Sequence, residues 1–96
     1  MGRPVARYAD PDMPHCSGMV RAKGSENVIT NGRPTERYAV DPNTPHLKPG
    51  GKKCVGHKAP IFKGGPTVFV NALPIGHKID PTCTAVAKGS ETVIAN

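Results

Sequence analysis

The sequence contains no tryptophan and only two tyrosines and two phenylalanines among its 96 residues. Aromatic side chains bury the largest apolar areas, so a short chain that nearly lacks them forms a thin hydrophobic core. We therefore expect a single domain spanning residues 1–96, in which a metal ion, a disulfide or a partner chain supplies stability that the core cannot.

The sequence also lacks a long apolar run and a signal peptide. No segment approaches the roughly 20 apolar residues that a membrane-spanning helix requires. The first residues, Met1-Gly2-Arg3-Pro4, lead directly into an extended segment. We therefore expect neither a membrane anchor nor export through a cleaved signal.

Cysteine is scarce and odd in number, because the chain carries only Cys16, Cys54 and Cys83. An odd number argues against a closed framework of disulfides. Cys16 directly follows His15, and Cys54 lies three residues before His57. Cysteine near histidine at turn positions points instead to a metal site, or to thiols without a role.

The chain is basic, with a formal net charge of +6 and a pI near 9.6. Such a charge fits nucleic acid or another acidic surface as a partner. The basic residues are scattered, however, and only Lys52-Lys53 forms a run. No series of alternating aromatic and basic residues is present for stacking bases. We therefore favour a solvated basic surface and expect no nucleic-acid partner.

One stretch occurs three times and organises the chain. It reads Lys-Gly-Ser-Glu-Asn-Val-Ile-Thr-Asn-Gly-Arg-Pro at 23–34, returns at 63–74 and recurs in shortened form at 88–96. The Gly-Ser or Gly-Gly pair is typical of a turn, the β-branched and aromatic run of a strand, and Asn-Gly of a second turn. Each copy therefore predicts a turn, a short strand and another turn.

A second repeated element begins with proline and ends with Asp-Pro. It reads Pro-Val-Ala-Arg-Tyr-Ala-Asp-Pro at 4–11, returns with one insertion at 34–42 and more loosely at 74–81. Strands of about five residues joined by such turns leave no room for a helix of normal length. Strands too short to be stable alone must stack, and pseudo-threefold winding is the simple solution. We expect an all-β fold of short wound strands.

The three loops after Asp-Pro carry the candidate metal ligands. Two loops place a histidine five residues after the aspartate, at His15 and His46, and the third places Cys83 three residues after it. If the repeats wind about one axis, equivalent loops gather at one end and these three side chains converge. Structural zinc takes four His or Cys ligands at tetrahedral angles. The loops therefore predict three of four ligands.

The fourth ligand must come from His57, Cys54 or Cys16. We favour His57, which lies at the foot of the long second loop, just before a strand expected at 59–62. Cys54 and His57 have a weakly zinc-like spacing, and Cys16 follows His15, so its side chain is expected to point away from a shared centre. Mixed His and Cys ligation favours zinc, with iron as the alternative.

Two other readings of the histidines and cysteines are not favoured. His77 falls in the register of Arg7 and Arg37, so we expect an exposed strand residue outside the site. Cysteine with histidine can also act as nucleophile and base. The short chain offers no evident oxyanion hole, and a zinc ion with four protein ligands has no open position for water. We therefore expect no enzyme, no catalytic residue and no small-molecule substrate.

These repeats resemble the PAAR-repeat family, named for a Pro-Ala-Ala-Arg motif. Pro-Val-Ala-Arg at 4–7 is the nearest copy, Pro-Thr-Glu-Arg at 34–37 keeps the Pro and Arg, and Pro-Ile-Gly-His at 74–77 keeps only the Pro. The family's companion pattern, Gly-Ser-Pro-Asn-Val-Phe-Val-Asn-Gly-Lys-Pro, is similar to three further stretches: 24–34, 64–74 and 89–96. The resemblance covers essentially the whole chain.

The resemblance implies a small cone of short strands that caps and sharpens a trimeric β-helical spike. Such tip proteins, one per spike trimer, belong to contractile injection machines, namely phage tails and type VI secretion, and meet the target cell membrane transiently. The resemblance also implies a flat base of strand edges that meets the spike, and a zinc ion near the vertex held by three His and one Cys. That count matches His15, His46, His57 and Cys83.

The same resemblance sets the expected location of the protein. Family members in secretion systems often carry effector extensions. This chain ends at Asn96, soon after the last expected strand, so we expect none and favour the tip of a phage tail over a protein secreted through the type VI apparatus. The alternative to a spike tip is a free-standing zinc-binding interaction module or nucleic-acid-binding module.

Overall fold

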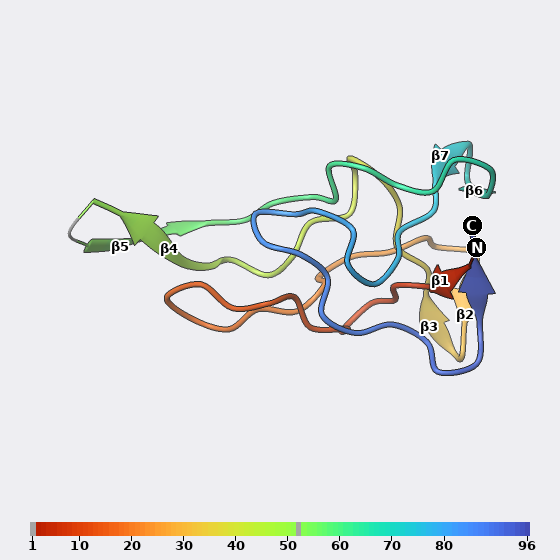
Figure 1. Ribbon diagram of the computed structural model, residues 1–96, viewed down its shortest axis with the longest axis horizontal. Helices are drawn as coiled ribbons and strands as arrows, with labels where there is room; N and C mark the ends of the chain where they lie inside the picture. The colour runs from red at the N-terminus through yellow and green to blue at the C-terminus, as the bar shows by residue number, and fades with distance from the viewer. Residues whose placement is uncertain (1, 52) are drawn as a thin grey trace.

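The computed structural model describes residues 2–51 and 53–96, which form short β-strands joined by loops (Figure 1). Within these residues there is no helix, and hence none long and apolar enough to cross a membrane. The strands form four antiparallel pairs: β1 (Arg3–Pro4) with β8 (Ile94–Ala95), β2 (Ile29–Thr30) with β3 (Arg33–Pro34), β4 (His46–Gly50) with β5 (Lys53–His57), and β6 (Phe69–Val70) with β7 (Leu73–Pro74). The predicted all-β class is confirmed.

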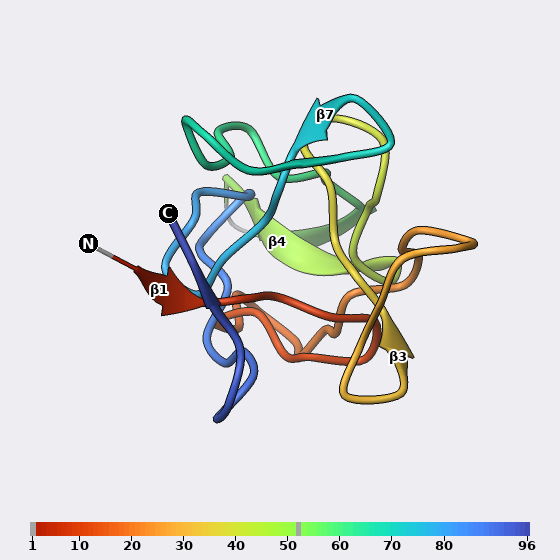
Figure 2. The same cartoon turned by 90° about the vertical axis from the view of Figure 1, so that its right-hand side faces the viewer.

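Three of these pairs come from the repeats. β2 and β3 flank the predicted Asn-Gly turn, in which Asn31 and Gly32 have φ of 52° and 77°. Positive φ at both central residues is what a two-residue hairpin turn of this kind requires. Asn71 and Ala72 form the equivalent turn between β6 and β7. In the third copy, β8 pairs with β1 instead of with a following strand. The three pairs lie at one end of the molecule and surround the β4–β5 hairpin in end view (Figure 2).

The proline-led segments of the three copies bind one another in a closed cycle. The backbone N–H of Ala6 donates to the carbonyl of Gly76 at 2.9 Å, Gly76 donates to Glu36 at 2.9 Å, and Glu36 donates to Ala6 at 3.0 Å. Single bridges follow the same cyclic order: Val5 with His77, Arg7 with Thr35, and Arg37 with Ile75. Each copy thus pairs with both others. This exchange of partners ends each strand after two residues, so the predicted length of about five holds only for β4 and β5.

The apolar core is as thin as the composition predicts. Within residues 2–51 and 53–96, six of the eight buried apolar side chains form two small clusters, one of Val5, Val70 and Ile75, the other of Ala6, Ile61 and Val86. Ile61 packs over the closed cycle, and a Cβ on Gly76 would lie 2.5 Å from its Cδ1. Ile61 therefore leaves no room for a side chain at Gly76.

Each copy also buries the aspartate of Asp-Pro against a nitrogen-bearing side chain. The three pairs, at 2.9, 2.8 and 2.9 Å, are Arg7–Asp10, Arg37–Asp41 and His77–Asp80. In each pair the aspartate also accepts from the backbone N–H of its partner. A buried charge is costly unless it is paired and hydrogen-bonded. These pairs therefore serve as a polar core for the repeat.

The prediction that His77 is exposed is wrong, because the side chain is fully buried. Its Nδ1 lies 2.9 Å from Asp80, and its Nε2 lies 3.0 Å from the carbonyl oxygen of Asn96. An imidazole reaches only one oxygen of the carboxylate, and Arg3 donates to the other at 2.7 Å. His77 and Arg3 together thus reach both carboxylate oxygens, as Arg7 and Arg37 each do alone in the other two copies.

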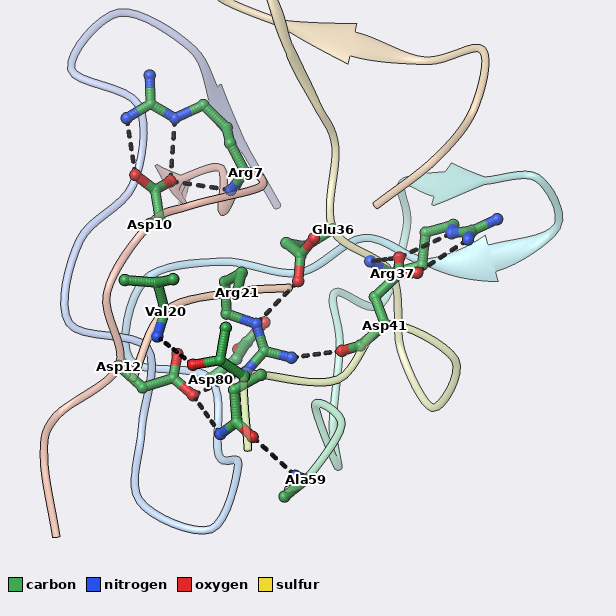
Figure 3. A network of polar contacts seen from close by, with 12 residues as sticks. Arg7, Asp10, Asp12, Val20, Arg21, Glu36, Arg37, Asp41, Ala59 and Asp80 are labelled. Atoms are coloured by element: carbon green, nitrogen blue, oxygen red, sulfur yellow. Dashed lines mark hydrogen bonds and ion pairs between the residues drawn. The ribbon is translucent and has the colours of Figure 1, made fainter. Parts of the chain in front are cut away.

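A buried ionic network is centred on Arg21, which contacts Glu36 of the closed cycle (Figure 3). The guanidinium donates to Asp12 at 2.7 Å, to Glu36 at 2.8 Å and to the backbone carbonyl of Asp41. Burial raises the pKa of Glu36 to about 8, although the hydrogen bond from Arg21 and its charge act in the opposite direction. This network was not predicted from the sequence.

Candidate metal centre

The long second loop forms the β4–β5 hairpin, which projects from the end of the molecule opposite the three short strand pairs (Figure 1). Its register runs from Gly50 opposite Lys53, near the turn, to His46 opposite His57 at the foot. The strand expected at 59–62 is reduced to a single bridge between Ile61 and Tyr38. The pairing therefore sets two histidines side by side where the hairpin meets the other loops.

The four predicted ligands, His15, His46, His57 and Cys83, come together at this foot. One ligand atom from each lies within 4.8 Å of the other three. The His46 and His57 ring centroids are 4.3 Å apart, and each lies 5.3 Å from that of His15. The Sγ of Cys83 lies 3.3 Å from Nε2 of His46. Loops that are distant in the sequence thus gather four donor atoms that could hold a metal ion.

Two ring nitrogens in this cluster have no hydrogen-bond partner and are open to a metal. Nε2 of His15 and Nε2 of His57 are buried without a hydrogen-bond partner, a state that costs about 1–3 kcal/mol for a typical polar group. In His46, Nδ1 lies 2.8 Å from the carbonyl oxygen of Thr44. Since a carbonyl only accepts, this nitrogen carries the proton and Nε2 keeps a lone pair beside Cys83. A backbone carbonyl that orients a histidine in this way is typical of metal sites.

The surroundings of His57 favour its neutral imidazole. Burial lowers the pKa of His57, and positive charge on His46, Lys48 and His15 lowers it further. A histidine must be neutral to bind a metal, so a lowered pKa favours binding near neutral pH.

Asn43 joins the cluster to the buried ionic network. Its side-chain NH2 lies 3.5 Å from Sγ of Cys83 and donates to Asp12 at 2.9 Å, and its carbonyl oxygen accepts from the backbone of Ala59 at 2.8 Å. A signal for this residue was present in the sequence. Asn43, Asp12 and Thr82 all stand two residues after the aspartate of Asp-Pro, and all three are buried.

Cys16 and Cys54 form a disulfide, so the expectation drawn from the odd number of cysteines is wrong. The bridge ties the loop of His15 to the β4–β5 hairpin beside the cluster. Both alternatives for the fourth ligand are therefore engaged elsewhere, and Cys83 remains a free thiol. The odd count reflects two separate uses of cysteine, one crosslink and one candidate ligand.

Three imidazole nitrogens and one cysteine sulfur form a donor set suited to a structural ion. Tetrahedral zinc at ordinary bond lengths places its ligand atoms about 3.5 Å apart, so the widest pair here has to close by about 1 Å. A metal held by all four side chains keeps no open coordination position, which favours a structural over a catalytic role. No protein-family model and no curated protein matches this chain.

Proposed function

We propose that this chain is the tip protein of a contractile injection machine, which caps and sharpens the trimeric β-helical spike. Its repeats wind pseudo-threefold into a small cone of the PAAR-repeat kind, and the role is structural rather than enzymatic. The observation that carries the proposal is the closed cycle formed by Ala6, Glu36 and Gly76. A single chain can match a threefold-symmetric partner if three equivalent segments are arranged around one pseudo-threefold axis.

The end of the molecule that carries the short strand pairs has the surface expected for such docking. The strands β2, β6 and β8 expose Ile29, Phe69 and Ile94 by more than half, at equivalent positions of the three copies. A depression beside them is lined mainly by apolar side chains, including Val68 and Val93. Contiguous apolar surface and open strand edges favour contact with another β-structure.

The opposite end carries the groups that could stabilise a tip. Few residues lie there, and His15, His46, His57 and Cys83 are placed to hold one ion. Structural zinc contributes on the order of 10 kcal/mol in small domains, and three nitrogen donors with one sulfur favour zinc, with iron as the alternative. A zinc ion and the Cys16–Cys54 disulfide would together fix the β4–β5 hairpin against force.

Mixing the protein with a trimeric β-helical spike and measuring the mass of the complex by light scattering tests the proposal. We expect one chain per spike trimer. Phe69→Glu should weaken the complex at least tenfold, because Phe69 lines the apolar depression. Phe62→Glu is the matched control, since both phenylalanines are 56% exposed and Phe62 is not among the lining residues.

Three results would contradict the proposal: no complex with the trimer, three chains per trimer, or equal losses of spike affinity in Phe69→Glu and Phe62→Glu. Binding to DNA with a steep dependence on salt, in place of spike binding, would favour the nucleic-acid-binding module instead. Spike binding would place the protein at the tip of a virion tail or of a type VI apparatus, of which we favour the phage tail.

A further inference from the structure

The β4–β5 hairpin lies within a long stretch that has no acidic residue. Residues 42–79 contain no Asp or Glu. Three lysines belong to the hairpin or follow it directly: Lys53 and Lys58 are exposed, and Lys48 is half-buried. Lys52 adds a fourth in the sequence but lies outside the described residues. The projecting end of the molecule therefore carries positive charge without a compensating acidic side chain from its own stretch.

The acidic residues of the rest of the chain do little to offset this charge. Five of the seven are buried and paired with Arg or His: Asp10, Asp12, Glu36, Asp41 and Asp80. The other two, Glu26 and Glu91, are exposed in the turns that lead into β2 and β8 at the opposite end. The two exposed acidic side chains thus lie away from the hairpin lysines, at the end that carries the short strand pairs.

Exposed aliphatic side chains lie among these lysines. Leu47 and Val55 are both exposed. In the antiparallel register Val55 lies directly opposite Lys48, and Leu47 lies opposite Gly56. Aliphatic side chains next to lysines suit the boundary between lipid headgroups and acyl chains, where a lysine stem stays in contact with apolar groups while its ammonium reaches phosphate.

We propose that the β4–β5 hairpin binds anionic phospholipid surfaces, with Lys48, Lys53 and Lys58 at headgroup phosphates and with Leu47 and Val55 in the acyl boundary. Single-stranded nucleic acid fits less well, because the hairpin carries no Phe, Tyr or Trp for stacking bases. The proposal rests on the proposed function in one respect: a spike tip is what brings this end to a membrane. The binding itself is a property of the isolated chain.

Vesicle sedimentation with the purified, folded protein tests this inference. The probes are mixed phosphatidylcholine–phosphatidylglycerol vesicles and pure phosphatidylcholine vesicles. The test variant combines Lys48→Gln, Lys53→Gln and Lys58→Gln. The matched control combines Lys23→Gln, Lys63→Gln and Lys88→Gln, which removes the same charge from exposed, equivalent Lys-Gly turns of the three repeats.

Wild-type protein should bind the anionic vesicles and not the neutral ones, with affinity falling as salt is raised. Each lysine near an anionic surface strengthens binding by roughly fivefold, so the hairpin variant should bind roughly a hundredfold more weakly. The control variant should lose only a few fold in affinity for the anionic vesicles. A Leu47→Ser, Val55→Ser double variant should also weaken binding while preserving the salt dependence.

Equal losses of vesicle affinity in the two lysine variants would overturn the inference, because binding would then depend on net charge alone and not on the hairpin. Absence of binding to anionic vesicles by the folded wild-type protein would overturn it as well. The inference would also be overturned if the protein bound single-stranded DNA more tightly than these vesicles and the hairpin variant lost that DNA binding. Spike binding is measured on the opposite end of the molecule, so failure of vesicle binding with an intact spike complex, or the reverse, separates the two proposals.

Discussion

His46 and His57 stand opposite each other as the last residue pair of the β4–β5 hairpin, with ring centroids 4.3 Å apart. Strand pairing alone thus delivers half of the candidate metal site. His15 and Cys83 then arrive from the first and third loops. Residues from all three repeats are needed to complete the cluster, so metal binding would hold the far end of the whole chain together.

Loss of the disulfide should loosen this end without removing the candidate ligands. Cys16 and Cys54 are 38 residues apart in the sequence, and closing a loop of that length stabilises a fold by about 4 kcal/mol in the chain-entropy model. The double variant Cys16→Ser, Cys54→Ser should therefore unfold at lower temperature and bind zinc more weakly, at an unchanged stoichiometry.

Thiol titration and thermal unfolding check this prediction. The unfolded wild-type protein should show one reactive thiol before reduction. The control Cys83→Ser should keep the disulfide and lose the metal. An unchanged unfolding temperature after reduction of the wild-type protein would show that the bridge does not stabilise the fold.

Stability should fall as pH rises from about 4.5 to about 8 through Glu36. The folded carboxyl has its pKa raised from 4.5 to about 8, so between these values the folded state binds a proton that the unfolded state has lost. Unfolding then releases a proton, which higher pH favours. The contribution of Glu36 to the free energy of unfolding is fully present below pH 4.5 and is lost as the pH rises to about 8.

Denaturant unfolding of wild type and Glu36→Gln at pH 6 and pH 8 isolates this effect, because the two proteins share all other titrating groups. Gln keeps an oxygen acceptor for Arg21 and does not ionise. The variant should therefore lose less stability than wild type over this interval, by roughly 1–3 kcal/mol. Equal losses would mean that Glu36 is already charged in the folded protein at pH 6.

Gly65 should not tolerate a side chain, although its counterparts in the other copies are Ser25 and Ser90. A Cβ here would lie 2.2 Å from the carbonyl oxygen of Asn96 and 2.6 Å from Cε1 of His77. Gly65→Ala should therefore destabilise the fold by at least about 1–3 kcal/mol, the usual cost of overpacking.

Thermal unfolding compares this variant with Gly18→Ala, whose Cβ would meet nothing within 4 Å. The Gly18 variant should unfold close to wild type. Comparable unfolding temperatures for the two variants would show that the chain moves aside at Gly65, and that the close approach of Asn96 is not required.

Repetition made much of this molecule predictable. The turn at Asn31-Gly32 and the strands beside it follow from local residue preferences, and the same pattern placed β6, β7 and β8. The convergence of His15, His46 and Cys83 follows from equivalent positions in equivalent loops. His57 could be predicted as the fourth ligand because it lies at the end of the long second loop, and that loop must return to the place where the three loops meet.

Departures from the repeat were harder to predict, because they depend on contacts between copies. His77 breaks the arginine pattern, yet it is buried because Asp80 still needs a donor and Arg3 of another copy completes the pairing. The three cysteines gave no reason to join Cys16 to Cys54, since only the folded hairpin brings them together. Arg21 lies outside both repeated elements, and nothing local marks it as the centre of a buried network.

The metal content of the purified protein, beside His15→Ala, His57→Ala and Cys83→Ala, tests the central claim most directly. We predict one zinc ion per wild-type chain, and loss of both the ion and cooperative thermal unfolding in each variant. The Cys16→Ser, Cys54→Ser variant serves as the control that keeps the ion. Two results would contradict the claim that a metal ion stabilises this end of the protein: a wild-type protein that folds without bound metal, or three variants that all retain the ion.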